Sequence, residues 1–189
     1  MVQKFYRFGV LLTLLLLLLC GLSSCVSAPP QEKYYYTLQY DPDSELPELI
    51  QSEPIDASVW VQPASISRTY KRNQIVMRHF GPRISYLENH LWANDLEEKV
   101  SELISARLKA YDLFEIIRLD FPYSRPDYEL IPTVTTIEFL HGEGSSTALL
   151  NMRFDLRTMD GNSVVTTEVE RRIAVYDSNL DSFVQVVNE

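Results

Sequence analysis

Cysteine is the residue type in this chain whose surroundings most clearly indicate chemistry. Cys25 follows an aliphatic residue and two small residues, Leu22-Ser23-Ser24, whereas Cys20 follows the bulky run 17–19. Small residues before a cleavage point let a peptidase reach the peptide bond. A thiol next to that bond can accept a diacylglycerol group at a membrane surface. We therefore expect Cys25, and not Cys20, to be lipidated.

The residues before Cys25 have the organisation of a secretory signal. Lys4 and Arg7 provide positive charge, and an almost wholly apolar run extends from Phe8 to Leu22. About fifteen apolar residues fall short of the roughly twenty that a membrane-spanning helix needs. Their charge, length and small-residue exit are typical of a cleaved signal peptide, and the exit resembles the bacterial lipobox. We therefore predict a signal peptide at residues 1–24, with Cys25 as the acylated, palmitate-carrying N-terminus of the mature protein.

Two alternatives are an uncleaved membrane anchor and an ordinary secreted protein with an unmodified cysteine. Pro29 and Pro30 would end a continuing helix, and no stop-transfer charges follow the apolar run. We therefore favour the signal peptide, with residues 25–33 as the lipidated cysteine and a tether. The eight residues after Cys25 reach at most about 25 to 30 Å. The folded domain, predicted at residues 34–189, must then lie close to its membrane.

The charge of the mature chain limits its partners. Residues 1–24 hold two of the 17 basic residues and none of the 26 acidic residues, which leaves a net formal charge of −11. Such a surface is repelled by nucleic-acid phosphates, so no nucleic-acid partner is expected. Cys25 is the only cysteine after cleavage, which excludes an internal disulfide and a thiolate metal site in one mature chain.

Other residue types that carry catalysis or bind metals are not arranged for it. No two of the three histidines, His79, His90 and His141, have the i, i+4 spacing of zinc hydrolases. The segment 142–147 is glycine-rich, but it lacks the lysine of a phosphate-binding loop and is better explained as a hairpin turn. A Gly-x-Ser-x-Gly nucleophile motif is also missing. We therefore expect no catalytic residues, no metal, no cofactor and no enzymatic activity.

The remaining candidates are residues that could bind a partner. The stretch 68–83 contains five basic residues and no acid, and Trp92 lies just before the clearest helix. Basic side chains suit an acidic partner or lipid phosphates, and aromatic side chains anchor many interfaces. The alternatives are a solvated loop and strand edge for the basic stretch, and a core position for Trp92. The predicted partner-binding residues are Arg68, Lys71, Arg72, Arg78, Tyr86 and Trp92.

These residues must be positioned by strands and two helices. Apolar residues from Leu96 to Tyr111 form one stripe, which predicts a helix over about 95–110 with Asn94 or Asp95 as its cap. A second amphipathic helix begins at Leu180, and because the sequence stops at Glu189 without a capping signal, we expect this helix to be truncated. The fold class is α+β, a single domain with a mixed, mostly antiparallel sheet and two main amphipathic helices packed on it. Strands are predicted at 34–38, 57–61, 74–78, 84–88, 114–119, 128–141, 147–159 and 163–176.

Several of these pieces together resemble the ABC-type transport auxiliary lipoproteins, the family that includes the lipoprotein component of the paraquat-inducible system. The matching pieces are the lipobox, Tyr35-Tyr36-Thr37-Leu38, 74–78, the stretch 84–93 that leads into the helix, and the Asp160-Gly161 turn. The resemblance covers nearly the whole mature chain. It implies a non-enzymatic, membrane-anchored accessory of a lipid transport system.

The resemblance also implies partners. Such systems pair an ABC permease and ATPase in the inner membrane with a mammalian-cell-entry (MCE) domain protein, and the lipoprotein would dock this periplasm-spanning partner. Val26 is not the aspartate that retains enterobacterial lipoproteins at the inner membrane. We therefore expect the periplasmic leaflet of the outer membrane. Homo-oligomerisation is left open. The alternatives are a periplasmic carrier of a lipid or other apolar ligand, and a structural lipoprotein without a transporter.

Overall fold

In the computed structural model, the described residues form a nine-stranded mixed sheet around its longest strand, β7 (Tyr128–Gly142). One edge of β7 pairs in turn with β2 (Ile55–Val61), β3 (Ser65–Ile66) and β4 (Gln74–His79), all of them parallel to β7. Its other edge pairs with β8 (Ser145–Thr158), antiparallel along the whole strand. The two long antiparallel pairings, β7 with β8 and β8 with β9 (Ser163–Val175), form most of the ladder.

The structure describes residues 31–42, 46–79, 81–121, 123–142, 144–176 and 179–188. Every element belongs to the compact unit Lys33–Glu189. The predicted signal peptide and Cys25 lie outside the described residues. No helix in these ranges is both long and apolar enough to cross a membrane.

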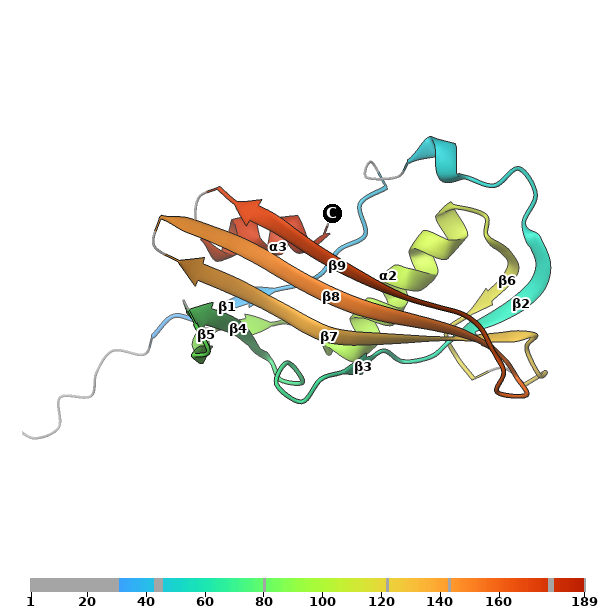
Figure 1. Ribbon diagram of the computed structural model, residues 1–189, viewed down its shortest axis with the longest axis horizontal. Helices are drawn as coiled ribbons and strands as arrows, with labels where there is room; N and C mark the ends of the chain where they lie inside the picture. The colour runs from blue at the N-terminus through green and yellow to red at the C-terminus, as the bar shows by residue number, and fades with distance from the viewer. Residues whose placement is uncertain are drawn as a thin grey trace, which may run out of the picture. The chain divides into compact units, whose positions relative to one another are not determined.

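Different strands lie beside the two ends of β7 (Figure 1). At its beginning, β2 pairs with β7 and with the short strand β6 (Phe114–Arg118). At its end, β4 pairs with β5 (Ile84–Trp92), and β5 with β1 (Tyr34–Tyr36), where the chain enters the sheet. The β7 residues that face β2 and β4, Glu129 and Phe139, are ten positions apart, about 33 Å along an extended strand.

Pro132 occupies the middle of β7, where a missing N–H donor would normally break the ladder. On the side of β7 that pairs with β2 and β3, the carbonyls of Leu130 and Val134 accept from the backbone N–H groups of Gln62 and Ser67. Pro132 therefore falls where the partner changes from β2 to β3, a position with no ladder bond to lose.

Both helices pack on one face of the sheet. In α2 (Leu96–Ala110), Leu96 and Val100 are buried in the main core, and in α3 (Leu180–Asn188) Phe183 is wholly buried against Phe139. A second cluster, around Val59, Val61 and Leu130, lies under the C-terminal half of α2 and β6. The predicted helix and its apolar stripe are confirmed. Asp95 is the cap, and its carboxylate accepts from the backbone N–H of Glu97 at 2.8 Å.

The hairpins are also confirmed, and some strand limits differ from the prediction. Gly144 (φ +79°) and Gly161 (φ +85°) adopt left-handed conformations in the β7–β8 and β8–β9 turns, which glycine reaches without steric cost. β5 continues to Trp92 instead of ending at Glu88, because its last residues pair with β1. β3 was not predicted, since two residues are too few to show a period. The segment before β2 contains a 3₁₀ turn at Pro47–Leu49.

β9 is an edge strand. In the described part of the chain it pairs only with β8, and residues 163–172 are all exposed. α3 covers the end of β9 and neither helix covers its beginning, so Val165 and Val169 remain in solvent although they share a face with the core residues of β8.

Candidate partner-binding surface

The predicted basic stretch is largely engaged within the protein. Arg78 on β4 donates to both carboxylate oxygens of Glu138, at 2.6 and 2.9 Å, and the Tyr70 hydroxyl donates to the same carboxylate at 2.8 Å. Glu138 is only 2% exposed and projects from β7 away from the helices. The hydrogen bond to Glu138 raises the pKa of Arg78 above its usual value. Arg78 therefore neutralises a buried acid, and little of its charge is available to a partner.

Two further cations of the stretch have internal contacts. Lys71 forms an ion pair with Glu97 at the start of α2, at 2.9 Å, and the guanidinium of Arg72 lies 3.6 Å from the centre of the Tyr86 ring. These contacts are at the surface, so both residues remain accessible. Arg68 and Arg83 are exposed, and no ion pair is found for either among the described residues.

Trp92, one of the predicted partner-binding residues, is a core residue in this structure. Its side chain is 5% exposed and packs against Phe183 of α3, with the ring centres 6.4 Å apart. The last residue of β5 points under α3 because β5 extends this far along β1. The core position, weighed as the alternative in the sequence, is the one observed. Tyr86 on the same strand is 36% exposed.

The three histidines lie on different strands and each contacts a hydroxyl group. His79 contacts Ser85 at 3.0 Å, and His141 contacts Ser146 at 3.2 Å. His90 contacts the hydroxyl of Tyr36 at 2.9 Å and stacks on Tyr34. Within the described ranges, no group of three or more His, Cys, Asp or Glu side chains is placed to hold a metal ion.

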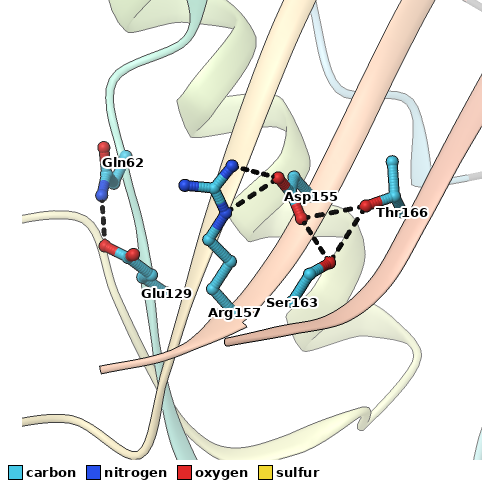
Figure 2. A network of polar contacts seen from close by, with 6 residues as sticks. All are labelled: Gln62, Glu129, Asp155, Arg157, Ser163 and Thr166. Atoms are coloured by element: carbon cyan, nitrogen blue, oxygen red, sulfur yellow. Dashed lines mark hydrogen bonds and ion pairs between the residues drawn. The ribbon is translucent and has the colours of Figure 1, made fainter. Parts of the chain in front are cut away.

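A polar network ties together the β8–β9 hairpin (Figure 2). The buried carboxylate of Asp155 accepts from Arg157 at 2.5 and 2.8 Å, from Ser163 at 3.0 Å and from Thr166 at 3.1 Å. These bonds, that from Arg157 foremost, hold the pKa of Asp155 below its usual value. Ser163 donates to a carboxylate whose other oxygen is engaged by Arg157, so the geometry stabilises the hairpin and does not activate the hydroxyl as a nucleophile.

An apolar cavity of about 110 Å³ lies between α2, α3 and the sheet. Its walls include Leu103 and Ile104 of α2, Met152 and Phe154 of β8, and Val187 of α3. Ligand pockets usually measure about 300 to 1,000 Å³. The cavity is therefore well below the size that a drug-sized or lipid ligand needs.

At the beginning of β7, the most exposed aromatic side chains belong to the loop between β6 and β7. Phe121 is 72% exposed, Tyr123 is fully exposed, and Leu119 is 36% exposed. Trp60 on β2 supports them: its Nε1 donates to the Leu119 carbonyl at 3.2 Å, and its ring meets Phe121 edge to face at 5.0 Å. We call Trp60, Leu119, Phe121 and Tyr123 the aromatic cluster. In the sequence, the signal for this cluster is two aromatic residues in a Pro-punctuated loop, which alone does not distinguish exposed from buried side chains.

Two hollows flank the aromatic cluster and share Leu119 and Asp120. One, of about 390 Å³, contains Phe121, Tyr123, Lys109 and Arg118. The other, of about 580 Å³, lies at the start of α2 and is strongly acidic. Its acids are Asp95, Glu97, Glu98, Glu102 and Asp120.

Comparisons with known proteins identify a matching family model and similar folds. The model of the "ABC-type transport auxiliary lipoprotein component" matches residues 36–189. Protein XCC0632 from Xanthomonas campestris has a similar fold, with a TM-score of 0.68, 12% identity, and coverage of 82% of this chain and 86% of that one. A second crystal structure, of an uncharacterized protein, has a TM-score of 0.63 and 16% identity, with coverage of 84% of this chain and 90% of that one. At these identities the likeness shows the fold alone. No curated protein matches.

Proposed function

The chain belongs to the ABC-type transport auxiliary lipoprotein family, and from this premise we propose that it is a non-enzymatic accessory that docks a periplasm-spanning partner of a lipid transport system. Membership supports the coarser role directly: a transport-related lipoprotein of the cell envelope. The proposal adds the mode of action, the partner and the membrane.

The observation that carries the proposal is the short connection between the predicted anchor and the sheet. β1 begins at Tyr34, nine positions after Cys25. This distance restricts the point where the chain enters the sheet to within about 30 Å of the lipid. Confinement near a membrane raises the effective concentration of any partner that reaches the same layer, without new contacts.

The partner and membrane follow from the family setting and one residue. An MCE domain protein, working with an ABC permease and ATPase, is the partner that the family resemblance implies. Val26 after the predicted lipidated cysteine favours the periplasmic leaflet of the outer membrane over the inner membrane.

The competing function is a carrier that holds a lipid or other apolar ligand itself. The cavity between the helices has the right chemistry, but its volume of about 110 Å³ is smaller than the engineered cavity of about 150 Å³ that takes benzene. A carrier would have to open substantially to take a lipid chain. The docking function needs no such change, and we prefer it.

The anchor is tested by labelling. We expect the wild-type chain to incorporate radioactive palmitate in cells and Cys25→Ser to incorporate none, with Cys20→Ser as the matched control that stays labelled. Label on the Cys25→Ser protein would contradict the assignment. Recovery of wild type solely in inner-membrane fractions would contradict the outer-membrane location.

Docking is tested by binding. The full-length chain, purified from envelopes in mild detergent, should bind the purified MCE domain protein of its own system in a pull-down. An unrelated lipoprotein prepared in the same detergent is the control. If the wild type retains no more MCE protein than this control, the docking function is wrong.

A further inference from the structure

We propose that the partner docks on the aromatic cluster and on the acidic hollow beside it. The partner would contribute an apolar socket, rimmed by basic side chains, that receives the aromatic cluster. This inference rests on the proposed docking function and assigns it a surface. It moves the contact from the basic stretch, whose Arg78 is internally paired, to the opposite end of β7.

The aromatic cluster has the properties of an interface anchor. Phe121 and Tyr123 expose most of their surface, and large aromatic side chains dominate the binding energy of many interfaces. Trp60 restrains the loop through its bond to the Leu119 carbonyl and its contact with Phe121. Less freedom is then lost when a partner covers the loop, because part of the ordering is already present in the free protein.

The charge around the aromatic cluster selects the kind of partner. Five acids line the adjoining hollow, and among the described residues Glu97 pairs with Lys71 and Glu102 with Lys99. Lys109 and Arg118 line the other hollow, so the acids outnumber these two cations beside the cluster. Asp120 lies in the loop itself, next to Phe121. An anionic membrane surface would be repelled by these acids, whereas lysine and arginine side chains of a protein would be attracted. The surface therefore fits a basic protein, and not lipid headgroups.

The position of the cluster agrees with a partner that approaches from outside the anchoring membrane. The chain enters the sheet at β1, beside β5 and β4 at the end of β7, whereas Trp60 pairs with Glu129 at the beginning of β7 (Figure 1). The two ends are about 33 Å apart along the strand. A tether that joins the domain at the end of β7 leaves the aromatic cluster, at the beginning of β7, accessible to a partner.

The test compares paired variants of the full-length chain in the pull-down with the MCE protein. Phe121→Ser with Tyr123→Ser should weaken the apparent Kd at least about tenfold. Tyr176→Ser is the matched control, because Tyr176 is also highly exposed (93%) but follows β9 at the other end. It should bind like wild type.

Charge is tested with a second pair. Glu98→Lys with Asp120→Lys should weaken binding and reduce its dependence on salt, whereas Glu168→Lys with Glu53→Lys, two exposed acids far from the hollow in sequence, should leave both unchanged. Arg68→Glu with Arg83→Glu tests the basic stretch in the same assay. If the partner docks on the aromatic cluster, the apparent Kd should change less than about twofold for this pair.

The outcomes separate the two proposals. If wild type binds and the Phe121, Tyr123 pair binds equally well, the surface is wrong and the docking function stands. If the Arg68, Arg83 pair alone loses binding, the basic stretch is the interface and the inference fails. If the aromatic variant abolishes cross-linking between copies of this chain but not partner binding, the cluster is a self-association surface, which also overturns it. If wild type itself does not bind, both proposals fall together.

Discussion

The two ends of β7 use charged and aromatic side chains in opposite ways. At its end, Glu138 and Trp92 are buried. Arg78, which is 31% exposed, pairs with the Glu138 carboxylate on one side of the sheet, and the indole packs under α3 on the other. At its beginning, Phe121 and Tyr123 are held outward. Glu138 and Trp92 therefore serve stability at one end, whereas Phe121 and Tyr123 are available for recognition at the other. The difference lies in which distant elements cover them.

The largest expected effect on stability concerns Trp92, at the end of β7. Trp92→Ala should lower the free energy of unfolding by about 3 to 5 kcal/mol, because it removes a buried ring and leaves a cavity under α3. Denaturant unfolding of the purified chain measures this, with Tyr35→Ala, a largely exposed aromatic nearby, as the control. A change below about 0.5 kcal/mol would mean that Trp92 is not in the core.

The buried carboxylate comes next. Glu138→Ala should cost about 3 kcal/mol, because it leaves the Tyr70 hydroxyl and the guanidinium of Arg78 without their shared acceptor. Glu138→Gln, which keeps the volume and one acceptor, should cost less. Equal stability of wild type and Glu138→Ala would contradict the view that this end of the basic stretch is internally committed.

The helix stripe gives a smaller effect. Leu103→Ala should cost about 2 kcal/mol, at the low end for core leucines, because Leu103 is only partly buried and already borders a cavity. Urea unfolding measures the change, and Glu98→Ala on the exposed side of α2 is the control. A loss under half a kcal/mol would show that the stripe does not pack on the sheet.

Acid should weaken the hairpin through Asp155. Its pKa is depressed in the folded state by the Arg157 and hydroxyl donors, so its contribution to stability is full above the ordinary carboxyl value near 4 and is lost as pH falls through the lower, folded value. The stability difference between wild type and Asp155→Asn should therefore shrink as the pH falls below about 4. A difference that stayed constant as the pH falls below about 4 would contradict this role of the Asp155 carboxylate.

The smallest stability effect belongs to the outward end. Phe121→Ser with Tyr123→Ser should change the free energy of unfolding by less than about 0.5 kcal/mol, because surface substitutions seldom do more. The same pair is expected to reduce partner binding strongly. Thermal unfolding and the pull-down together check the comparison; a large loss of stability would show that the loop is a structural element.

Local patterns in the sequence predicted the local parts of this fold. The stripe from Leu96 to Leu108 repeats with the helix period and is found in α2, and the Asp160-Gly161 turn requires a left-handed glycine at Gly161. The pairing of Arg78 with Glu138, 60 positions apart, depends on β4 lying parallel to β7. A period within one strand contains no information about its neighbour.

The same limit explains the candidate site. The stretch 68–83 contains no acid, so its sequence predicts a partner-binding or solvated basic surface. In the structure, Glu97 and Glu138 from other elements pair with two of its cations. Trp92 was ambiguous because the end of β5 is set by its pairing with β1. The aromatic cluster also depends on strand pairing, because Trp60 and Phe121 come into contact only when β2 and β6 are neighbours.

The open edge of β9 imposes a solubility constraint on the sequence. Among the described residues, the thirteen of β9 have one row of backbone donors and acceptors without a strand partner. Such a row can template the addition of foreign strands, the first step of aggregation. Charged side chains at positions 168, 170, 171 and 172 interrupt this row, so a strand that joined it would have to desolvate them. Glu168, Glu170, Arg171 and Arg172 thus act as gatekeepers, and neutralising them would endanger the soluble state of the domain before it disturbed its fold.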